Sequence, residues 1–328
     1  MRRAIQLAAG GRGHVSPNPM VGAVIVAPGG RVIGEGWHRR FGGPHAEVNA
    51  VRSVSESDRA LFPQSTIYVT LEPCSHYGKT PPCASLLISC RIGRVVVGAG
   101  DPNPKVAGRG IAMLREAGIE VQEHCLEEEC RSQNIRFMTA HTQHRPYVTL
   151  KWACSSDGFM DAERAPGMPA FRFSDACGAQ TVHWRRAVHD AIAVGAGTAI
   201  ADNPRLDTRL FDGSNPRPII FDRRKLADKG NCALLERAET LHITDGSSIA
   251  DVLHRLYSAE GITSLLVEGG AGLLEAFIDA GLWDEAFVEV SPHVLGTRGC
   301  VVSPALAQMP CDMFKTGCST ILHYLNRL

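Results

Sequence analysis

The first half of the chain alternates short apolar runs with amphipathic stretches, which is the pattern of an α/β domain. Apolar, β-branched runs bounded by glycine, proline or polar residues predict buried strands, and longer segments of helical period predict helices. The predicted strands are residues 21–26, 32–37, 66–71, 94–98 and 119–124. The predicted helices are residues 1–10, a helix with Pro44 at its first position, a helix opened by Pro81 and Pro82 that runs to Cys90, and residues 108–117.

The same alternation restarts after a polar stretch of helical tendency at residues 127–144, which we interpret as a connector. Strands are predicted at residues 147–153, 191–195, 218–222, 240–244, 264–268 and 285–291, and helices at 179–188, 251–257 and 272–279. The sequence therefore predicts two α/β domains, residues 1–145 and 146–328, with the boundary just before Pro146.

Composition agrees with two domains and narrows the class of protein. A chain of 328 residues is too long for one ordinary core, and 44% hydrophobic with 21% charged residues is typical of a globular protein. Thirty-four basic residues balance thirty-four acidic ones, which argues against nucleic acid as a partner. The apolar stretch within residues 1–10 is too short for a signal peptide, and no later apolar segment suggests a membrane span. With eleven cysteines expected to be reduced, we predict a cytoplasmic protein.

One constellation carries chemistry. His45 and Glu47 are separated by one residue, and Cys74 and Cys83 follow downstream. One imidazole and two thiolates give zinc (Zn²⁺) three ligands and leave the fourth position for water, as in catalytic zinc sites. Glu47 is placed to carry the proton of that water to a leaving group. Both parts of the motif are predicted at helix starts, where unpaired N–H groups favour a thiolate.

The motif resembles that of zinc nucleobase and nucleoside deaminases, H-x-E followed by P-C and a second cysteine. The longer spacing from Cys74 to Cys83 resembles the deaminase half of the bifunctional riboflavin-biosynthesis deaminase/reductases, as do residues 17–26 and 101–110. The resemblance implies a cytidine-deaminase-like three-layer domain in which His45, Cys74 and Cys83 hold zinc, Glu47 is the acid/base, and a diaminopyrimidinone ribosylamino 5′-phosphate loses its 2-amino group.

The resemblance also implies where that substrate, a small pyrimidine ribonucleotide, is bound. Asn18 matches the pocket asparagine, although a turn residue between two prolines is an alternative. His76 and Lys79 lie in the loop that receives the phosphate in this family, although Lys79 also fits a solvated surface charge. Asn103 is expected to shape its loop and contact the ligand, and His38 is a weaker candidate.

Residues 151–158, 194–198, 202–206 and 267–270 follow in the order found in the reductase half of the same family. The resemblance implies a dihydrofolate-reductase-like domain that reduces the ribosyl group to a ribityl chain with NADPH. The expected substrate residues are Lys151, Arg186, Asp202, Arg209 and Glu268. The expected cofactor residues are Cys154, Phe171, Thr198, Gly269, Gly270 and Gly272. A surface set of ion pairs is the alternative explanation of the charged residues.

Two departures from the family pattern affect the second domain. Residues 171–174, Phe-Arg-Phe-Ser, stand where the family has an aromatic Trp-Ile-Thr segment, so the detailed substrate pocket differs. Arg223 and Arg224 follow the strand at residues 218–222, where the family has a serine. We predict that one of these two arginines binds the 2′-phosphate of NADPH through a bidentate, charge-assisted contact.

Two other functions remain open from the sequence. One is a deaminase of nucleosides or tRNA with a fused nucleotide-binding module, and the other is a zinc-stabilised binding protein without turnover. A homo-oligomer is a further option, for which residues 286–290 would be an edge strand.

Overall fold

The computed structural model describes residues 1–76, 81–103, 106–165 and 168–326. The chain divides into two compact units, Met1–Gln143 and His144–Leu328, close to the boundary predicted before Pro146.

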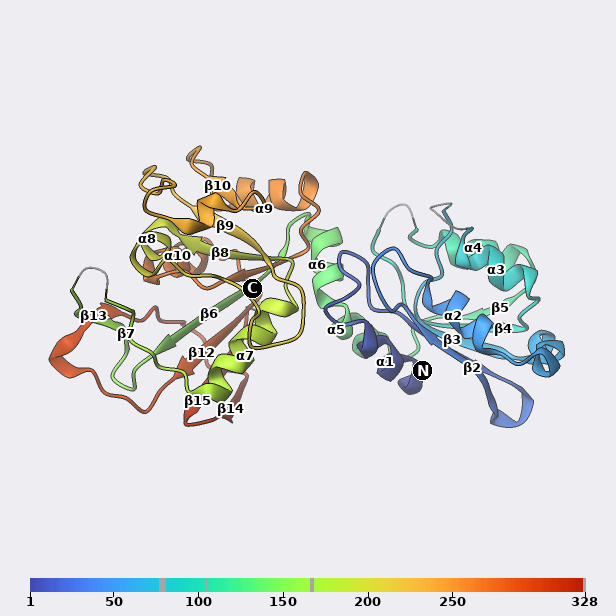
Figure 1. Cartoon of the computed structure of the whole chain (residues 1–328). Coiled ribbons are helices and arrows are strands. Elements are labelled where there is room, and N and C mark those ends of the chain that lie inside the picture. The colour runs from blue at the N-terminus through green and yellow to red at the C-terminus, as the bar shows by residue number, and fades with distance from the viewer. Residues whose placement is uncertain (77–80, 104–105, 166–167, 327–328) are drawn as a thin grey trace. The chain divides into compact units, whose positions relative to one another are not determined.

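The first unit is built on a five-stranded sheet of order β2-β1-β3-β4-β5 (Figure 1). Its strands are β1 (Gly22–Val26), β2 (Val32–Trp37), β3 (Thr66–Leu71), β4 (Arg94–Ala99) and β5 (Glu120–Gln122). Strand β1 is antiparallel to β2 and β3, whereas β3, β4 and β5 are parallel. All five predicted strands are present. Strands β1, β3 and β4 are largely buried, and buried strands read as apolar runs in the sequence.

Helices cover both faces of this sheet, which confirms the predicted three layers. The helices are α1 (Arg2–Ala8), α2 (Ala46–Ser53), α3 (Cys83–Ser89), α4 (Arg109–Glu116), α5 (Glu127–Gln133) and α6 (Ile135–Gln143). On one face, Ala50 of α2, Leu87 of α3 and Leu114 of α4 share a core with strand residues. On the other face, Cys130 and Met138 form a second cluster with Ile5.

Two sequence-based predictions about this unit were wrong. Helix α2 begins at Ala46 with His45 as its N-cap, so Pro44 precedes the helix instead of standing at its first position. Residues 127–144 are not a connector, since α5 and α6 contribute Cys130 and Met138 to the core of the first unit. Their apolar residues face that core while their polar residues face outward, which made the segment look polar overall.

The second unit contains an eight-stranded sheet of order β10-β9-β8-β11-β6-β12-β15-β14. Its strands are β6 (Tyr147–Cys154), β8 (Ala191–Gly195), β9 (Arg217–Phe221), β10 (Leu241–Ile243), β11 (Ser264–Val267), β12 (Glu285–Val290), β14 (Asp312–Thr316) and β15 (Ser319–Leu325). The strands from β10 to β12 in this order are parallel, and β15 and β14 are antiparallel additions. A separate two-stranded sheet pairs β7 (Phe159–Ala162) with β13 (Gly299–Val302).

Helices α7 (Ala176–Ala187), α8 (Ala196–Asp202), α9 (Ile249–Ser258) and α10 (Ala271–Asp279) complete this unit. Cores lie on both faces of the sheet, one including Leu253 and Phe277 and the other Ala199 and Leu206. The suggestion that residues 286–290 form an edge strand was wrong, because β12 lies between β6 and β15. The sequence also gave no indication of α8, β7, β13, β14 and β15.

Candidate functional site

The imidazole and the carboxylate of the zinc motif come from the start of α2. His45 has extended backbone angles and is the N-cap residue, so its side chain stands at the helix entrance. Glu47 lies in the first turn and its side chain is buried, with 3% exposure. Gly36 of β2 permits this arrangement, because a Cβ at that position would lie 2.3 Å from the backbone nitrogen of Ala50.

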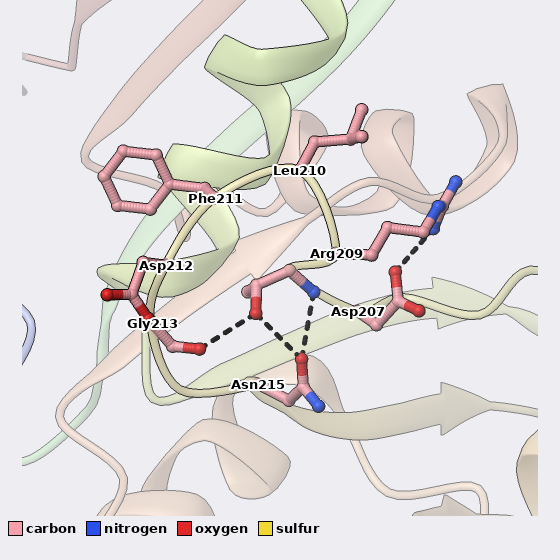
Figure 2. Close-up of a pocket in the computed structure, with 8 residues that line it drawn as sticks. Asp207, Arg209, Leu210, Phe211, Asp212, Gly213 and Asn215 are labelled. Atoms are coloured by element: carbon pink, nitrogen blue, oxygen red, sulfur yellow. Dashed lines mark hydrogen bonds and ion pairs between the residues drawn. The ribbon is translucent and has the colours of Figure 1, made fainter.

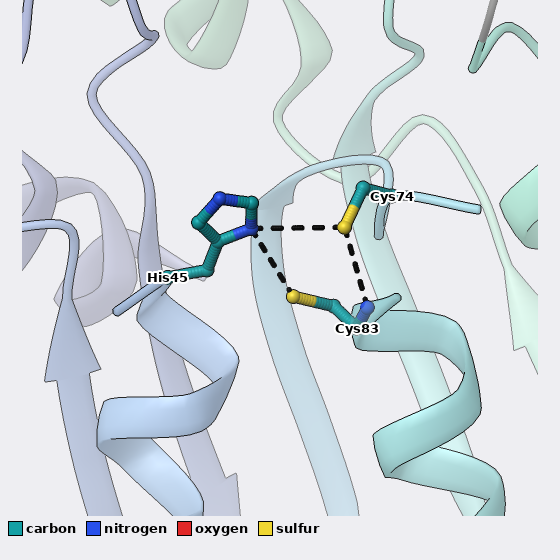
Figure 3. A group of neighbouring side chains, drawn as sticks. All are labelled: His45, Cys74 and Cys83. Atoms are coloured by element: carbon teal, nitrogen blue, oxygen red, sulfur yellow. Dashed lines mark hydrogen bonds between the residues drawn. The ribbon is translucent and has the colours of Figure 1, made fainter. Parts of the chain in front are cut away.

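The two thiols come from the loop after β3 and from the start of α3. The backbone N–H of Cys83 donates to Sγ of Cys74 at 3.2 Å, and Nδ1 of His45 lies 3.6 Å from Cys74 Sγ and 3.3 Å from Cys83 Sγ (Figure 3). The three potential ligand atoms all lie within 4.8 Å of one another. The structure therefore brings together the three residues predicted as ligands.

These spacings suit zinc. Zinc–sulfur and zinc–nitrogen bonds of about 2.3 and 2.1 Å that meet at a tetrahedral angle place nitrogen and sulfur about 3.6 Å apart. A set of two sulfurs and one imidazole nitrogen also favours zinc over the oxygen-preferring cations. The donor set and its dimensions thus fit a zinc ion with three protein ligands.

Electrostatics favour an ionised Cys74 beside a carboxyl group that can exchange protons. Hydrogen bonds from the Cys83 thiol and from His45 lower the pKa of Cys74 to about 4, and the same pairing raises the pKa of Cys83. Burial, and then the negative charge of Cys74, raise the pKa of Glu47 to about 7. Groups with such displaced pKa values are typical of catalytic sites.

Glu72, which immediately precedes the Pro73-Cys74 turn, is a site residue that the sequence analysis missed. Its buried carboxylate accepts backbone N–H groups of Gly108 at 3.0 Å and Gly110 at 3.0 Å, at the start of α4. A negative charge at a helix N-terminus is stabilising. Glu72 therefore fixes α4 against the loop that carries Cys74, and only the folded contact could reveal this role.

Asn18 and His38 lie close to the imidazole of His45. The side-chain nitrogen of Asn18 is 3.2 Å from Nε2 of His38, and the His38 ring meets the His45 ring edge-on at 5.5 Å. Asn134, which the sequence analysis missed, holds this segment through two 2.8 Å bonds to the backbone of Met20. Both pocket candidates are thus brought to the zinc motif.

The remaining substrate candidates of the first unit are His76, Asn103 and Lys79. His76 is exposed and lies near Asp101, whose pKa is raised to about 6, chiefly by burial. The backbone N–H of Asn103 donates to Asp101 at 2.8 Å, which places Asn103 on the same side of the site. Lys79 lies outside the described residues.

In the second unit, the glycine-rich turn predicted for the cofactor lies at the carboxyl ends of the parallel strands. The backbone N–H of Gly270 donates to Thr198 Oγ1 at 2.9 Å, and a Cβ at Gly270 would lie 2.9 Å from the same oxygen. Around Gly272, in the first turn of α10, the space is open. Ligands of open parallel sheets bind beyond this edge, and a glycine turn before a helix can receive phosphate.

Lys151, Arg186 and Glu268 form a buried charged group. Arg186 bonds Glu268 at 2.7 and 3.3 Å. Burial alone raises the pKa of Glu268, but the positive charges of Arg186 and then Lys151 outweigh burial, and the pKa is lowered. These side chains are largely buried, so the structure argues against the alternative of a surface set of ion pairs.

Arg209 lies beside Arg186, because both contact Asp207. Arg186 donates to the backbone oxygen of Asp207 at 3.2 Å, and Arg209 pairs with its carboxylate at 2.5 Å (Figure 2). Residues 207–213 and Asn215 line an open pocket of ≈ 540 Å³, and Asn215 fixes the loop through the backbone and hydroxyl of Thr208. Asp202, at the end of α8, pairs instead with Arg164.

The other cofactor candidates are spread around the same edge of the sheet. Cys154 ends β6 and is buried in the core. The ring of Phe171 lies 4.9 Å from that of Phe173 and 5.4 Å from that of His293. Arg223 and Arg224 follow β9 and are exposed, and within the described ranges neither takes part in an ion pair.

The turn that carries these two arginines is fixed by Asp222. Its buried carboxylate accepts the N–H groups of Leu226 and Ala227, each at 2.9 Å, and lies 3.0 Å from Nε2 of His242. The guanidinium groups are therefore presented from a rigid turn at the carboxyl end of β9.

Throughout residues 1–76, 81–103, 106–165 and 168–326, each helix falls short of the length and apolar character needed to cross a bilayer.

Two protein families match the chain. Residues 1–99 match the cytidine and deoxycytidylate deaminase zinc-binding region, and residues 146–321 match the RibD C-terminal domain. The chain is 38% identical to riboflavin biosynthesis protein RibD of Bacillus amyloliquefaciens over 322 residues, covering 90% of this chain and 84% of that protein. Identity with the Escherichia coli protein of the same name is 36% over 344 residues, covering 94% and 92%.

Solved structures match over nearly the whole chain. RibD of Acinetobacter baumannii superposes with a TM-score of 0.86 at 32% identity, covering 99% of this chain and 97% of that one. A diaminohydroxyphosphoribosylaminopyrimidine deaminase/5-amino-6-(5-phosphoribosylamino)uracil reductase of Thermotoga maritima gives 0.83 at 35% identity, covering 98% and 96%. These matches agree with the two α/β domains described above.

Proposed function

Since the chain belongs to the RibD family of riboflavin biosynthesis, whose members join a deaminase to a reductase, we propose which of its residues carry each activity. The chain is a bifunctional enzyme of this pathway. In the first unit, His45, Cys74 and Cys83 hold zinc and Glu47 moves protons. This assignment rests on one observation. The potential ligand atoms of the three residues lie within 4.8 Å of one another, beside the buried carboxyl group of Glu47.

The first reaction is hydrolytic deamination of 2,5-diamino-6-ribosylamino-4(3H)-pyrimidinone 5′-phosphate. Zinc, when bound, acts as a Lewis acid that makes water nucleophilic near neutral pH. Glu47 accepts one proton from the attacking water and delivers it to a ring nitrogen, and it then passes the second proton of that water to the amino group, which leaves as ammonia. The ring carbon thereby exchanges its C–N bond for a C–O bond. A group that both accepts and donates a proton works best with a pKa near neutrality, and burial raises the pKa of Glu47 to about 7.

The pyrimidine ring is held by Asn18, whose side chain is oriented by His38, and the opposite loop contributes Asn103. His76 and Lys79 receive the phosphate. The support for this arrangement is the convergence of Asn18, His38 and His45, and of the loops that carry His76 and Asp101, around the zinc motif.

The second reaction reduces the open-chain ribosyl group of the deaminated product to a ribityl chain. NADPH, when bound, supplies the hydride. The N–H groups of the Gly269–Gly272 turn receive its pyrophosphate, with Thr198 shaping the turn, and Cys154 and Phe171 border the cofactor. Arg223 or Arg224 binds its 2′-phosphate.

The sugar phosphate is held by Lys151, Arg186, Asp202, Arg209 and Glu268. Two neighbouring arginines on Asp207 suit a phosphate, and a buried carboxylate suits the sugar hydroxyl groups. The product is 5-amino-6-ribitylaminouracil 5′-phosphate.

We also propose a cytoplasmic location, since all eleven cysteines are free, as expected in a reducing compartment. The suggested homo-oligomer stays a prediction, although β12, as an interior strand, does not provide the edge suggested for it.

One experiment tests the assignment of both activities. The purified protein is supplied with the diaminopyrimidinone phosphate, and ammonia release and NADPH consumption are measured with and without the cofactor. We expect ammonia in both cases and NADPH consumption only after deamination. Release of ammonia from nucleosides or tRNA, with none from this phosphate, would favour the alternative deaminase.

A further inference from the structure

Glu289 is a buried carboxylate that the reactions described above leave without a role. It lies on the interior strand β12 and is 1% exposed. Phe287 is the register partner of Lys151 on β6, and side chains two positions apart on a strand share a face. Glu289 therefore projects from the same face of the sheet as Lys151.

One carboxylate oxygen of Glu289 lies close to both Ser174 and Lys151. Oε2 accepts the hydroxyl of Ser174 at 2.7 Å and lies 3.7 Å from Nζ of Lys151. Oε1 is buried and, within the part of the chain that is described, has no hydrogen-bond partner. A Cβ at Gly178 would lie 3.0 Å from Oε1, so glycine at this position of α7 leaves room for the carboxylate.

Burying a carboxylate inside a protein core is energetically unfavourable. Removing such a charge from water costs several kcal/mol, and an apolar residue of similar volume is often at least as stabilising. Lys151 offsets part of this cost, and Lys151 also acts on Glu268. The ammonium group thus lies within the electrostatic reach of two buried carboxylates, one in the proposed substrate group and one behind it.

The space beside Glu289 argues against direct contact with substrate. Lys151, Phe287 and Glu289 help to line an enclosed cavity of only ≈ 10 Å³, which has room for about one water molecule and for no part of a nucleotide. Any effect of Glu289 on the reaction is therefore exerted through side chains that it contacts, among them Lys151 and Ser174.

We propose that Glu289 is a positioning residue of the reductase, which holds the Lys151 ammonium toward the sugar phosphate and anchors the segment at residues 171–174. This inference rests on the proposed role of Lys151 in substrate binding. Residues 171–174 are also where the sequence departs from the family pattern, so Glu289 ties that unusual segment to the substrate lysine.

The test compares Glu289→Gln, which keeps the shape and removes the charge, with the wild-type chain. The deaminated substrate and NADPH are varied separately. We expect KM for the substrate to rise roughly tenfold or more, as for a displaced positioning group, while KM for NADPH and the rate of ammonia release stay unchanged. Ser174→Ala, which removes only the hydroxyl, should raise KM for the substrate to a smaller extent.

Glu275→Gln, an exposed change on α10, is the matched control and should leave both activities unchanged. Unaltered substrate KM in Glu289→Gln, or a parallel rise of both KM values with a lower Tm, overturns the positioning role. Lys151→Gln separates this result from the proposed function. If Lys151→Gln reduces substrate as well as wild type does, the role proposed for Lys151 is wrong and the inference about Glu289 falls with it.

Discussion

At the scale of single residues, the proposed deamination mechanism depends most directly on Glu47. Its carboxyl group is buried beside the three residues that could bind zinc, but Glu47 is not one of those three residues. Glu47→Gln keeps the size of the side chain and removes its ability to exchange a proton. We expect ammonia release to fall by roughly 10²- to 10⁴-fold, the usual contribution of general acid–base catalysis, with bound zinc unchanged.

This prediction is checked by measuring ammonia release and metal content on the same preparation. Glu56→Gln, an exposed change in the same unit, should alter neither quantity. A near wild-type rate in Glu47→Gln would show that another group carries the protons.

Glu72 supports a second prediction, about stability. Its carboxylate accepts N–H groups from Gly108 and Gly110 at the start of α4, and replacing it with alanine leaves buried donors unpaired. We expect Glu72→Ala to lower the free energy of unfolding of the first unit by about 1–3 kcal/mol or more, since the lost acceptor was charged. Thermal unfolding measures the change, and Glu116→Ala, on the exposed side of α4, is the control. An unchanged Tm in Glu72→Ala would contradict the role assigned to this carboxylate.

Single residues could be predicted from the sequence only where residue types and their spacing along the chain indicated a role. The candidate ligands His45, Cys74 and Cys83 could be proposed from the sequence because their types and spacing suit a metal ion, and the structure brings their ligand atoms within 4.8 Å of one another. Glu72 could not, because its partners follow more than thirty residues later and only folding brings them together. The prediction for Lys79 stays a prediction, since it lies outside the described residues.

At the scale of elements, the approach of α4 to the Cys74 loop gives a third prediction. A Cβ at Gly110 would lie 1.9 Å from the backbone oxygen of Pro73, so alanine at this position must push the helix or the loop aside. We expect Gly110→Ala to weaken zinc binding and reduce deamination by at least tenfold, because the ligand that follows Pro73 is displaced.

Gly100→Ala is the matched control, because no atom lies within 4 Å of a Cβ there. Metal content and ammonia release are measured for both variants. Equal behaviour of the two would mean that the close packing of α4 on the loop is not needed for the site.

The turn after β9 gives a fourth prediction. Arg223 and Arg224 are exposed, and Asp222 fixes the turn that presents them. We expect Arg223→Ala or Arg224→Ala to raise KM for NADPH by roughly tenfold or more, with little change for NADH, because one bidentate contact with the 2′-phosphate is lost. Steady-state kinetics with both cofactors measures the preference. If neither variant changes the ratio, the 2′-phosphate is bound elsewhere.

Elements could be predicted from sequence where burial made the pattern clear. The parallel strands β3, β4, β8 and β11 are buried runs of apolar residues and were located within a residue or two. Strand β14 was missed because all its positions are exposed or half-buried, with Met313 and Phe314 among the exposed ones. Interior and edge positions of β12 could not be distinguished, because the order of strands in a sheet is set by the topology of the whole domain and not by the residues of one strand alone.

At the scale of the whole molecule, each unit has a hydrophobic interior of its own. The clusters that include Ile67 and Cys130 belong to the first unit, and those that include Leu150 and Ile192 belong to the second. The residues proposed as zinc ligands all come from the first unit, and the residues proposed for NADPH all come from the second. Loss of the metal should therefore affect one activity and spare the other.

Treatment with a chelator tests this independence. We expect removal of zinc to abolish ammonia release, and added zinc to restore it, while reduction of the already deaminated substrate by NADPH continues at roughly the wild-type rate. Cys74→Ser should separate the activities in the same way, whereas Cys90→Ser, at a half-buried cysteine that is not among the ligands, should keep both. Loss of both activities on chelation would mean that the reductase depends on the metal, and the assignment of one activity to each unit would then be wrong.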